Sequence, residues 1–466
     1  MKKSYLKKVL LGIVFSLLII TAYFLGLFSS QYNGSLYDTL NSIYKNKATF
    51  LSKALSNKNE ELREKGRWRA ARQYLRESGL TEKQQESLLK ISALPYLKGY
   101  KTAPDIKNVT VYDKPTAYNG LNFVLSGHAP QAFLMDMKGN ILHQWSYAFE
   151  AVWPTKLDFF ENNIHKTFWR RAHLFPNGDL LAIFEGIGLI KLDKNSKLIW
   201  AYQGRAHHDI FVTENGNIYV LTRQELLKPK GLPIDTPILE DFITVLNSDG
   251  QEIRKISILD VFLNSDYASL LLNIRNGGDV FHTNTLEILD RKIVDRYPLL
   301  KQMFKHGTVL ISLRKLHTIA VVDIEQETVT WALTGMWNFQ HQPTLLKNGN
   351  LLVFDNNSSN GESRVIEINP LTQEIVWSYE GSEKDKFFSD TCGSNLRLPN
   401  GNTLITESDN GRAFEVTYDN KIVWEFMNPY RAGKNNELIA TLFEVIRMDI
   451  DYFRDQSWLP QASDIN

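Results

Sequence analysis

The chain has 466 residues, of which 43% are hydrophobic and 12% aromatic, enough to bury one large core or two modest ones. Its 53 basic and 52 acidic side chains give a net charge of +1, so the balance does not indicate the broad basic surface of a nucleic-acid partner. Cys392 is the single cysteine, which excludes an intramolecular disulfide. Stability must therefore come from the core.

The N-terminus combines a basic segment with a long apolar one. Residues 1–8, MKKSYLKK, hold four lysines and are predicted to stay in the cytoplasm. Residues 9–28 carry no charge and are long enough to cross a bilayer core of about 30 Å, so they are predicted to be a transmembrane signal anchor. A cleaved signal peptide is the alternative, but the apolar run is long for one and no A-x-A-like site follows it. The rest of the chain is then expected on the periplasmic or extracytoplasmic side of a single-pass membrane protein.

Residues 29–107 are predicted to form a helical stem. Apolar residues recur there at three-to-four spacing, and no proline occurs before Pro95. The charged run EELREKGRWRAAR, residues 60–72, is interpreted as a solvated helix face, with contact to the membrane surface as the alternative.

From residue 108 onward the sequence repeats. One phrase, a turn followed by a β-branched run and a tryptophan, occurs five times, with a sixth copy that has Ile256 in the tryptophan place. These tryptophans are expected to pack between repeats; they are Trp145, Trp200, Trp331, Trp377 and Trp424. Four strands in each repeat of about fifty residues predict an all-β fold, a six-bladed β-propeller over residues 108–430.

The second phrase is an Asn-Gly turn followed by an apolar run, as in LFPNGDLLAIF, VTENGNIYVLT, LLKNGNLLVFD and RLPNGNTLIT. One repeat is longer because ILDRKIVDRYPLLKQMFK is inserted between two of its strands. Residues 431–466 are predicted to be a helical tail packed on the propeller or on the stem.

The Asn-Gly turn serves as a ruler for candidate site residues. His341 lies seven residues before Asn348, His208 lies seven before Asn215, and Arg170 lies seven before Asn177. His282, in FHTNTLEIL, occupies the same place relative to the start of its strand. Equivalent positions of successive blades lie on one ring around the axis, so these side chains are expected to face one central funnel.

A second polar ring follows seven residues after the turn glycine: Glu185, Arg223, Arg314, Asn356 and Ser408. Converging imidazoles and guanidiniums are costly near a propeller axis unless they are paired or meet an anion. The arginines, Asn356 and the histidines, with His207 beside His208, suit a tetrahedral anion such as sulfate or phosphate. Three histidines could instead ligate zinc or copper, but nearby arginines would repel a cation, so no metal is predicted.

This set of residues predicts group transfer. A neutral histidine can take the group covalently, the arginines can stabilise charge on its oxygens, and another histidine can move the proton. No P-loop or Gly-rich nucleotide motif is present, so neither a nucleotide donor nor any other cofactor is predicted. The residues alone leave open which of His208, His282 and His341 is the nucleophile.

Over residues 118–428 the sequence resembles the bacterial arylsulfotransferases, six-bladed propellers that move a sulfuryl group from a phenolic ester to another phenol. The resemblance rests, in order, on HHDI, His282-Thr-Asn284, SLR ending at Arg314, QHQP, LLVFDN, SRVIEINP and RLPNGNTLIT. It implies that His341 carries the transient sulfuryl group and that His208, His282, Asn284 and Arg314 bind or polarise it. The implied partners are an aryl sulfate donor and a phenolic acceptor.

The chain differs from the well-known secreted enzymes of that family, which have a disulfide near the site and a separate N-terminal β-domain. It is therefore interpreted as a divergent, membrane-anchored member. Two other hypotheses remain: a non-catalytic membrane-tethered propeller that acts as a scaffold or a receptor for sulfated ligands, and a metal-dependent hydrolase or lyase that uses the same histidines.

Overall fold

The computed structural model describes residues 67–70, 103–153, 164–358, 361–382, 385–433, 436–453 and 458–459. The chain divides into two compact units, Met1–Glu64 and Lys65–Asn466, and every described residue belongs to the second unit. The predicted anchor at residues 9–28 and most of the predicted stem lie outside the described residues. Within the residues that are described, no helix has the length and apolar character needed to span a membrane.

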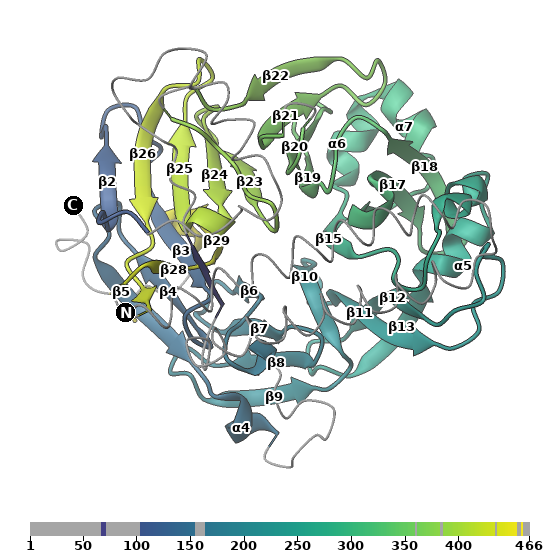
Figure 1. Cartoon of the computed structure of the whole chain (residues 1–466), viewed down its shortest axis with the longest axis horizontal. Coiled ribbons are helices and arrows are strands. Elements are labelled where there is room, and N and C mark those ends of the chain that lie inside the picture. Colours follow the sequence, from purple (N-terminus) through teal and green to yellow (C-terminus); the bar gives the residue numbers. More distant parts are fainter. Residues whose placement is uncertain are drawn as a thin grey trace, which may run out of the picture. The chain divides into compact units, whose positions relative to one another are not determined.

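Six mainly antiparallel sheets follow one another around a common centre, which confirms the predicted six-bladed propeller (Figure 1). From the innermost strand outward, blade 1 is β29 (Leu442–Met448), β3 (Leu121–Ser126), β4 (Gln131–Met135) and β5 (Ile141–Ser146). Blade 2 is β6 (Arg171–Leu174), β7 (Leu180–Phe184), β8 (Gly188–Leu192) and β9 (Leu198–Tyr202). Blade 3 is β10 (Ala206–Val212), β11 (Ile218–Leu226), β12 (Ile238–Leu246) and β13 (Glu252–Ser257), with β14 (Gly278–Asp279) beside β12.

The remaining three blades follow the same order. Blade 4 is β15 (Thr283–Ile288), β16 (Val309–Leu313), β17 (Thr318–Asp323) and β18 (Thr328–Thr334). Blade 5 is β19 (His341–Leu345), β20 (Leu351–Asp355), β21 (Arg364–Ile368) and β22 (Ile375–Tyr379). Blade 6 is β23 (Ser394–Arg397), β24 (Thr403–Glu407), β25 (Arg412–Val416), β26 (Ile422–Met427) and β2 (Asn108–Tyr112).

Helices are short and lie between strands. The insertion predicted from ILDRKIVDRYPLLKQMFK forms α6 (Arg291–Arg296) and α7 (Pro298–Phe304) between β15 and β16. The other α-helices in the described part are α4 (Phe149–Val152) and α5 (Ile258–Leu263). The 3-10 turns are η3 (Ile164–Lys166), η4 (Ala268–Asn273), η5 (Arg314–Leu316), η6 (Ser408–Asn410) and η7 (Ile450–Tyr452).

The repeated tryptophans lie on the outermost repeat strand of five blades and bind the neighbouring blade, as predicted. The indole of Trp145 in blade 1 donates to the Gly178 carbonyl of blade 2 at 3.0 Å. Trp424 of blade 6 donates to the Met137 carbonyl of blade 1 at 2.9 Å. The same contact is made by Trp200 to Ser248 and by Trp377 to Tyr418. These four indoles therefore fix the spacing between neighbouring blades, and Trp331 packs in the cluster between blades 4 and 5.

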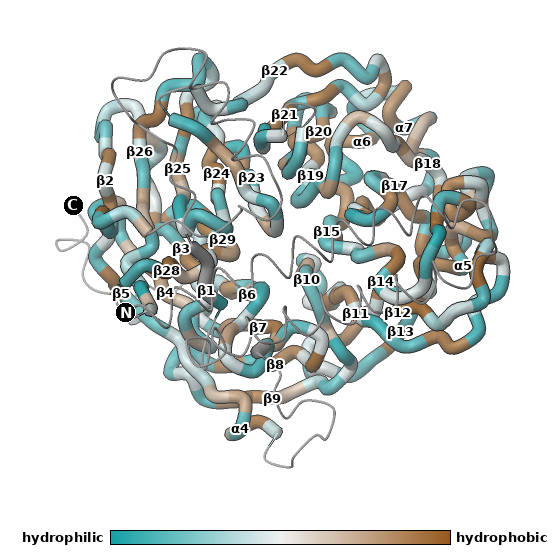
Figure 2. The backbone as a smooth tube through the Cα atoms, viewed as in Figure 1, coloured by the Kyte–Doolittle hydropathy of each residue, from teal (hydrophilic) through white to brown (hydrophobic). Residues whose placement is uncertain are grey.

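The core lies between the blades rather than within them. Six buried clusters each join one pair of neighbouring sheets. In β20, Leu351 and Val353 pack against blade 4, while Leu352 and Phe354 pack against blade 6. Because successive side chains of a strand point to opposite faces and both faces are covered, the strand reads as a continuous apolar run. Figure 2 accordingly shows brown, hydrophobic segments within the blades and teal, hydrophilic ones at β15 and β19 near the centre.

The predicted helical tail is wrong where the structure describes it. Residues 442–448 form β29, which pairs antiparallel with β3 and completes blade 1. The run LFEVIRM is apolar at helical spacing, but its partner strand lies more than 300 residues earlier, and that pairing overrides the local pattern. The propeller therefore extends past residue 430. At the other end of the propeller, β2 pairs with β26 on the outside of blade 6, so both ends of the domain close the ring.

One described part of the predicted stem also differs from a helix. Trp68–Ala70 form strand β1, which pairs with β28 (Leu438–Ala440) in a small sheet that also contains β27 (Arg431–Ala432). Backbone hydrogen bonds to an open strand edge outweigh the helical preference of three residues.

Candidate active site

The innermost strands of blades 3, 4 and 5 present the predicted histidines. His207 and His208 lie in β10, His282 immediately precedes β15, and His341 is the first residue of β19. Each of these strands carries a β-bulge at that point, between His207 and Ile210, Thr283 and Thr285, and His341 and Thr344. A bulge re-aims side chains that a regular ladder would point elsewhere.

The backbone near the bulges adopts the left-handed region at non-glycine residues. His208 has φ 53°, His282 has φ 50° and Gln342 has φ 46°. Such angles cost free energy for residues with a Cβ and cluster at functional sites. Strand pairing also corrects the spacing counted from the Asn-Gly turns. In blade 5, His341 pairs with Phe354, and the equivalent residue of blade 3 is Leu221. The partner of Leu221 is His207 and not His208.

His341 is oriented by two oxygens on the same ring nitrogen. Its Nδ1 lies 2.7 Å from Asn356 Oδ1 and 3.0 Å from the Phe339 carbonyl. The Asn356 amide is itself fixed, because its Nδ2 donates to the carbonyls of Ser389 at 2.8 Å and Cys392 at 2.6 Å. Both neighbours of Nδ1 are therefore acceptors, so Nδ1 must carry the proton. The lone pair is on Nε2, which has no hydrogen bond in the described part of the chain.

The electrostatic surroundings keep this imidazole neutral. Burial, followed by the positive charge of Arg314, lowers the pKa of His341 well below its usual value. The Arg314 guanidinium lies 4.6 Å from the centre of the Phe339 ring and donates to the Asp390 carbonyl at 3.4 Å. A neutral, correctly oriented imidazole beside a guanidinium is suited to attack an anionic ester.

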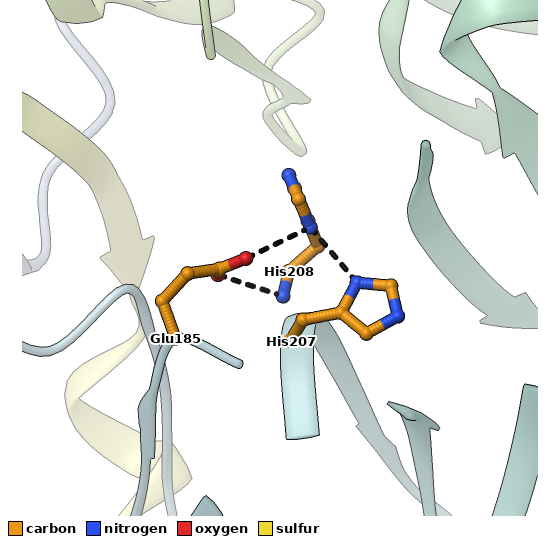
Figure 3. A group of neighbouring side chains, drawn as sticks. All are labelled: Glu185, His207 and His208. Atoms are coloured by element: carbon orange, nitrogen blue, oxygen red, sulfur yellow. Dashed lines mark hydrogen bonds and ion pairs between the residues drawn. The ribbon is translucent and has the colours of Figure 1, made fainter. Parts of the chain in front are cut away.

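On the opposite side, Glu185, His207 and His208 form a buried cluster whose side chains point toward one another (Figure 3). The two Nδ1 atoms lie 2.9 Å apart, and His208 Nδ1 lies 3.3 Å from a Glu185 oxygen. His207 Nε2 faces Asp241 at 3.4 Å. Burial lowers the pKa of His207 to about 3 and that of His208 well below its usual value, so both rings are neutral.

This cluster has the ligand types of a metal site but the wrong charge around it. A tetrahedral ion with bonds of about 2.0–2.1 Å keeps its ligand atoms about 3.3 Å apart, and the two short separations are near that value. However, Arg223 lies 3.8 Å and Arg170 lies 4.0 Å from the Glu185 carboxylate. Burial would raise the pKa of Glu185, but these two charges lower it, so the carboxylate is already neutralised by cations. The geometry favours a hydrogen-bond network with excess positive charge over a cation site.

His282 has a carboxylate partner that sequence reasoning missed. Its Nδ1 makes a short contact with Asp279, and its ring centre lies 4.7 Å from that of His208. Burial would raise the pKa of Asp279, but the hydrogen bond and the charge of His282 lower it, so the carboxylate is ionised. The contact is local, three residues apart, so the D-x-x-H spacing was available in the sequence, and the pairing of β14 with β12 holds this segment in place.

The predicted residues differ in what they contact. A first group surrounds Glu185 and consists of Arg170, Arg223, His207 and His208. In a second group, Asn356 and Arg314 contact residues 389–393, and His341 is joined to them through Asn356. Asn284 links the bulge of β15 to the start of β19, because its Nδ2 donates to the carbonyl of Gln340, the residue before His341, at 2.8 Å. The 389–393 loop was also missed, since its contribution is made by backbone carbonyls, which any sequence can supply.

The fold is a six-bladed propeller, and neutral histidines and arginines gather at its centre, an arrangement that suits an anion. Residues 171–429 match the family described as arylsulfotransferase (ASST), which is more than half of the sequence. The chain belongs to the arylsulfotransferase family. No curated protein matches the sequence.

Solved structures show weaker similarity. A protein of unknown function from Bacteroides caccae is 11% identical, with 70% of this chain and 98% of that chain covered and a TM-score of 0.44. A streptogramin B lyase is 12% identical, with coverages of 75% and 97% and a TM-score of 0.39. A virginiamycin B lyase from Staphylococcus aureus is 10% identical, with coverages of 74% and 97% and a TM-score of 0.38. Similarities at this level carry no argument about chemistry.

Proposed function

We propose that the protein transfers a sulfuryl group from an aryl sulfate to a phenol through a covalent intermediate on His341, without a nucleotide donor. The observation that carries this proposal is the fixed tautomer of His341. Two carbonyls hold Asn356, Asn356 holds the Nδ1 proton, and the Nε2 lone pair is left for attack. Family membership and the neighbouring Arg314 support sulfur as the atom attacked.

In the first half-reaction the Nε2 lone pair forms an N–S bond and the S–O bond to the aryl group breaks. The electron pair leaves with the phenolate oxygen, which takes a proton from an acid. In the second half-reaction the acceptor phenol gives its proton to the same group, its oxygen attacks sulfur, and the N–S bond breaks. The sequence returns His341 to its neutral state with no net change in protons.

His282 is suited to carry that proton. An ionised Asp279 accepts from His282 Nδ1, which leaves Nε2 as the base and stabilises the imidazolium that forms. Arg314 and the arginines around Glu185 supply positive charge for the sulfuryl oxygens. From the sequence alone, we further propose that the anchor at residues 9–28 holds this site outside the cytoplasm.

The direct test is to expose the protein briefly to a nitrophenyl sulfate, quench it and search its peptides by mass spectrometry for an added sulfuryl group. We expect modification of the peptide that contains His341, with release of one nitrophenol per site before any acceptor is added. Subsequent addition of a phenol must remove the label. A label on His208 or His282 would show that this histidine, and not His341, is the nucleophile. Donor binding without nitrophenol release would favour a receptor for sulfated ligands.

A further inference from the structure

An arginine from outside the six blades reaches the site. Arg67 immediately precedes β1, and its backbone is tied to blade 1 on both sides. Its N–H donates to the Gly127 carbonyl at 2.5 Å, and its carbonyl accepts from Thr441 N at 2.9 Å. These bonds fix the place from which its side chain extends.

The guanidinium of Arg67 contacts the 389–393 loop. Its Nη2 donates to Thr391 Oγ1 at 3.0 Å and its Nη1 lies 3.5 Å from Cys392 Sγ. Arg67 and Arg170 both lie over the Phe443 ring, at 5.5 and 5.1 Å from its centre. A planar guanidinium with two donors on neighbouring residues restrains both of them at once.

The 389–393 loop also holds the reacting side of the site. The carbonyls of Ser389 and Cys392 accept from Asn356, and the carbonyl of Asp390 accepts from Arg314. The carboxylate of Asp409 accepts from the backbone N–H of Thr391 at 3.0 Å and from its hydroxyl at 2.9 Å. A continuous set of contacts therefore joins Arg67 to the Nδ1 proton of His341.

We propose that Arg67 is a positioning residue for the transfer reaction, which holds Thr391 and Cys392 so that the Cys392 carbonyl keeps Asn356 bound to His341. This inference rests on the proposed function. It makes the segment before the propeller part of the site. Misplacement of a reacting atom by about 1 Å costs about a hundredfold in rate, so a loosened loop has a measurable effect.

The test uses the full chain and the variants Arg67→Gln and Arg67→Lys, with Arg254→Gln as the matched control. Arg254 lies in β13, on the outside of blade 3, and pairs with Glu325 at 2.9 Å. We expect Arg67→Gln to slow the nitrophenol burst about tenfold or more, with the donor KM changed less than about threefold. Arg67→Lys keeps the charge but not the fork, and we expect it to recover only part of the rate. Arg254→Gln leaves the rate unchanged.

A double-mutant cycle separates positioning from direct contact with the substrate. If Arg67 acts through Asn356, then Arg67→Gln in an Asn356→Ala background costs less than about twofold. An equal loss in both backgrounds, or a loss expressed in the donor KM, would overturn the positioning role. So would a rate loss that only follows the unfolded fraction.

A second readout does not depend on activity. The amides of Thr391 and Gly393 donate to Asp409 and to the Ser408 hydroxyl, so their hydrogen exchange reports the order of the loop. We expect hydrogen exchange at these two amides to be at least about fivefold faster in Arg67→Gln than in the unaltered protein. In Arg254→Gln the exchange rate should not change. If the unaltered protein transfers no sulfuryl group but this change is seen, the proposed function fails and the positioning of the loop stands. Unchanged exchange would disprove the positioning itself.

Discussion

The inner strands of blades 3, 4 and 5 differ from those of blades 2 and 6. The first three are bulged where they reach the centre and carry His208, His282 and His341 at or beside the bulge. In blades 2 and 6 the corresponding pairs, β6 with β7 and β23 with β24, keep a regular register throughout. The inner strand of blade 1, β29, is also bulged, between Leu442 and Glu444, but carries no histidine there, so bulge and histidine coincide only in blades 3, 4 and 5.

The largest expected difference between the two regions is between two histidines. His341→Ala should lower sulfuryl transfer by at least about a thousandfold, because in the proposed mechanism it removes the atom that bonds to sulfur. His173→Ala, in the regular strand β6, should change the rate per folded protein by less than about threefold. Initial rates with a nitrophenyl sulfate and a phenol measure both. Comparable losses would mean that the bulges do not distinguish the reactive blades.

The second largest effect is expected at the amide that sets the tautomer. Asn356→Ala should lower the burst rate about ten- to a hundredfold, because Nδ1 loses an acceptor and a larger fraction of rings carries the proton on Nε2. Asn402 of blade 6 is the matched control, since it is buried and donates to Glu415 at 2.7 Å. Asn402→Ala should lower the thermal midpoint but leave the burst rate of the folded protein unchanged.

A smaller effect is expected from pH. Because the pKa of His341 is lowered by burial and by Arg314, the neutral ring persists below the pH at which a free histidine is protonated. The burst rate with a nitrophenyl sulfate, whose leaving group needs no acid, should change less than about twofold between about pH 8 and about pH 6. An inflection near the pKa of a free histidine would indicate another nucleophile.

The free energy of unfolding is also expected to depend on pH, through the buried histidines of the inner strands. The unfolded chain binds protons at these histidines near their usual pKa, but the folded chain binds them only at lower pH. The stability that the neutral rings allow is therefore present above about pH 6.5 and is lost as pH falls toward the lowered values, which are about 4 for His173 and about 3 for His207. Acid unfolding should set the lower limit of activity.

The smallest effect tests the backbone strain at a bulge. Gln342→Gly should raise the free energy of unfolding by up to about 1 kcal/mol, because glycine adopts φ 46° without a Cβ penalty and the backbone hydrogen bonds remain. Gly393→Ala is the opposite case, since the added Cβ would lie 2.6 Å from the Phe354 ring at φ 103°. It should destabilise the fold by about 2 kcal/mol or more in a denaturant titration.

The sequence was most informative where its signal is local and repeated. Tryptophans at a fixed place and Asn-Gly turns identified the blades, and the turn ruler found His208 and His341, because spacing to a turn determines depth along a strand. Counting from the turn could not show that His207, and not His208, has the strand partner equivalent to that of His341. A bulge inserts a residue into the strand and shifts the count, but it leaves the turn unchanged.

Contacts made by distant pairing were not predictable. Arg67 reaches Thr391 across more than 300 residues. The run 442–448 was assigned to a helix because nothing near it in the sequence indicates a strand partner. In each case the deciding contact belongs to the assembled ring and not to the segment.

The pairing of β29 with β3 has a consequence for how the protein is made. When a ribosome has synthesised β3, β4 and β5, the inner edge of that sheet has no partner, and it gains one only after the other five blades have been translated. For all that time the nascent domain exposes a strand edge that other chains can pair with. Delayed closure makes blade 1 the place where aggregation competes with folding, and where a chaperone would have most to protect.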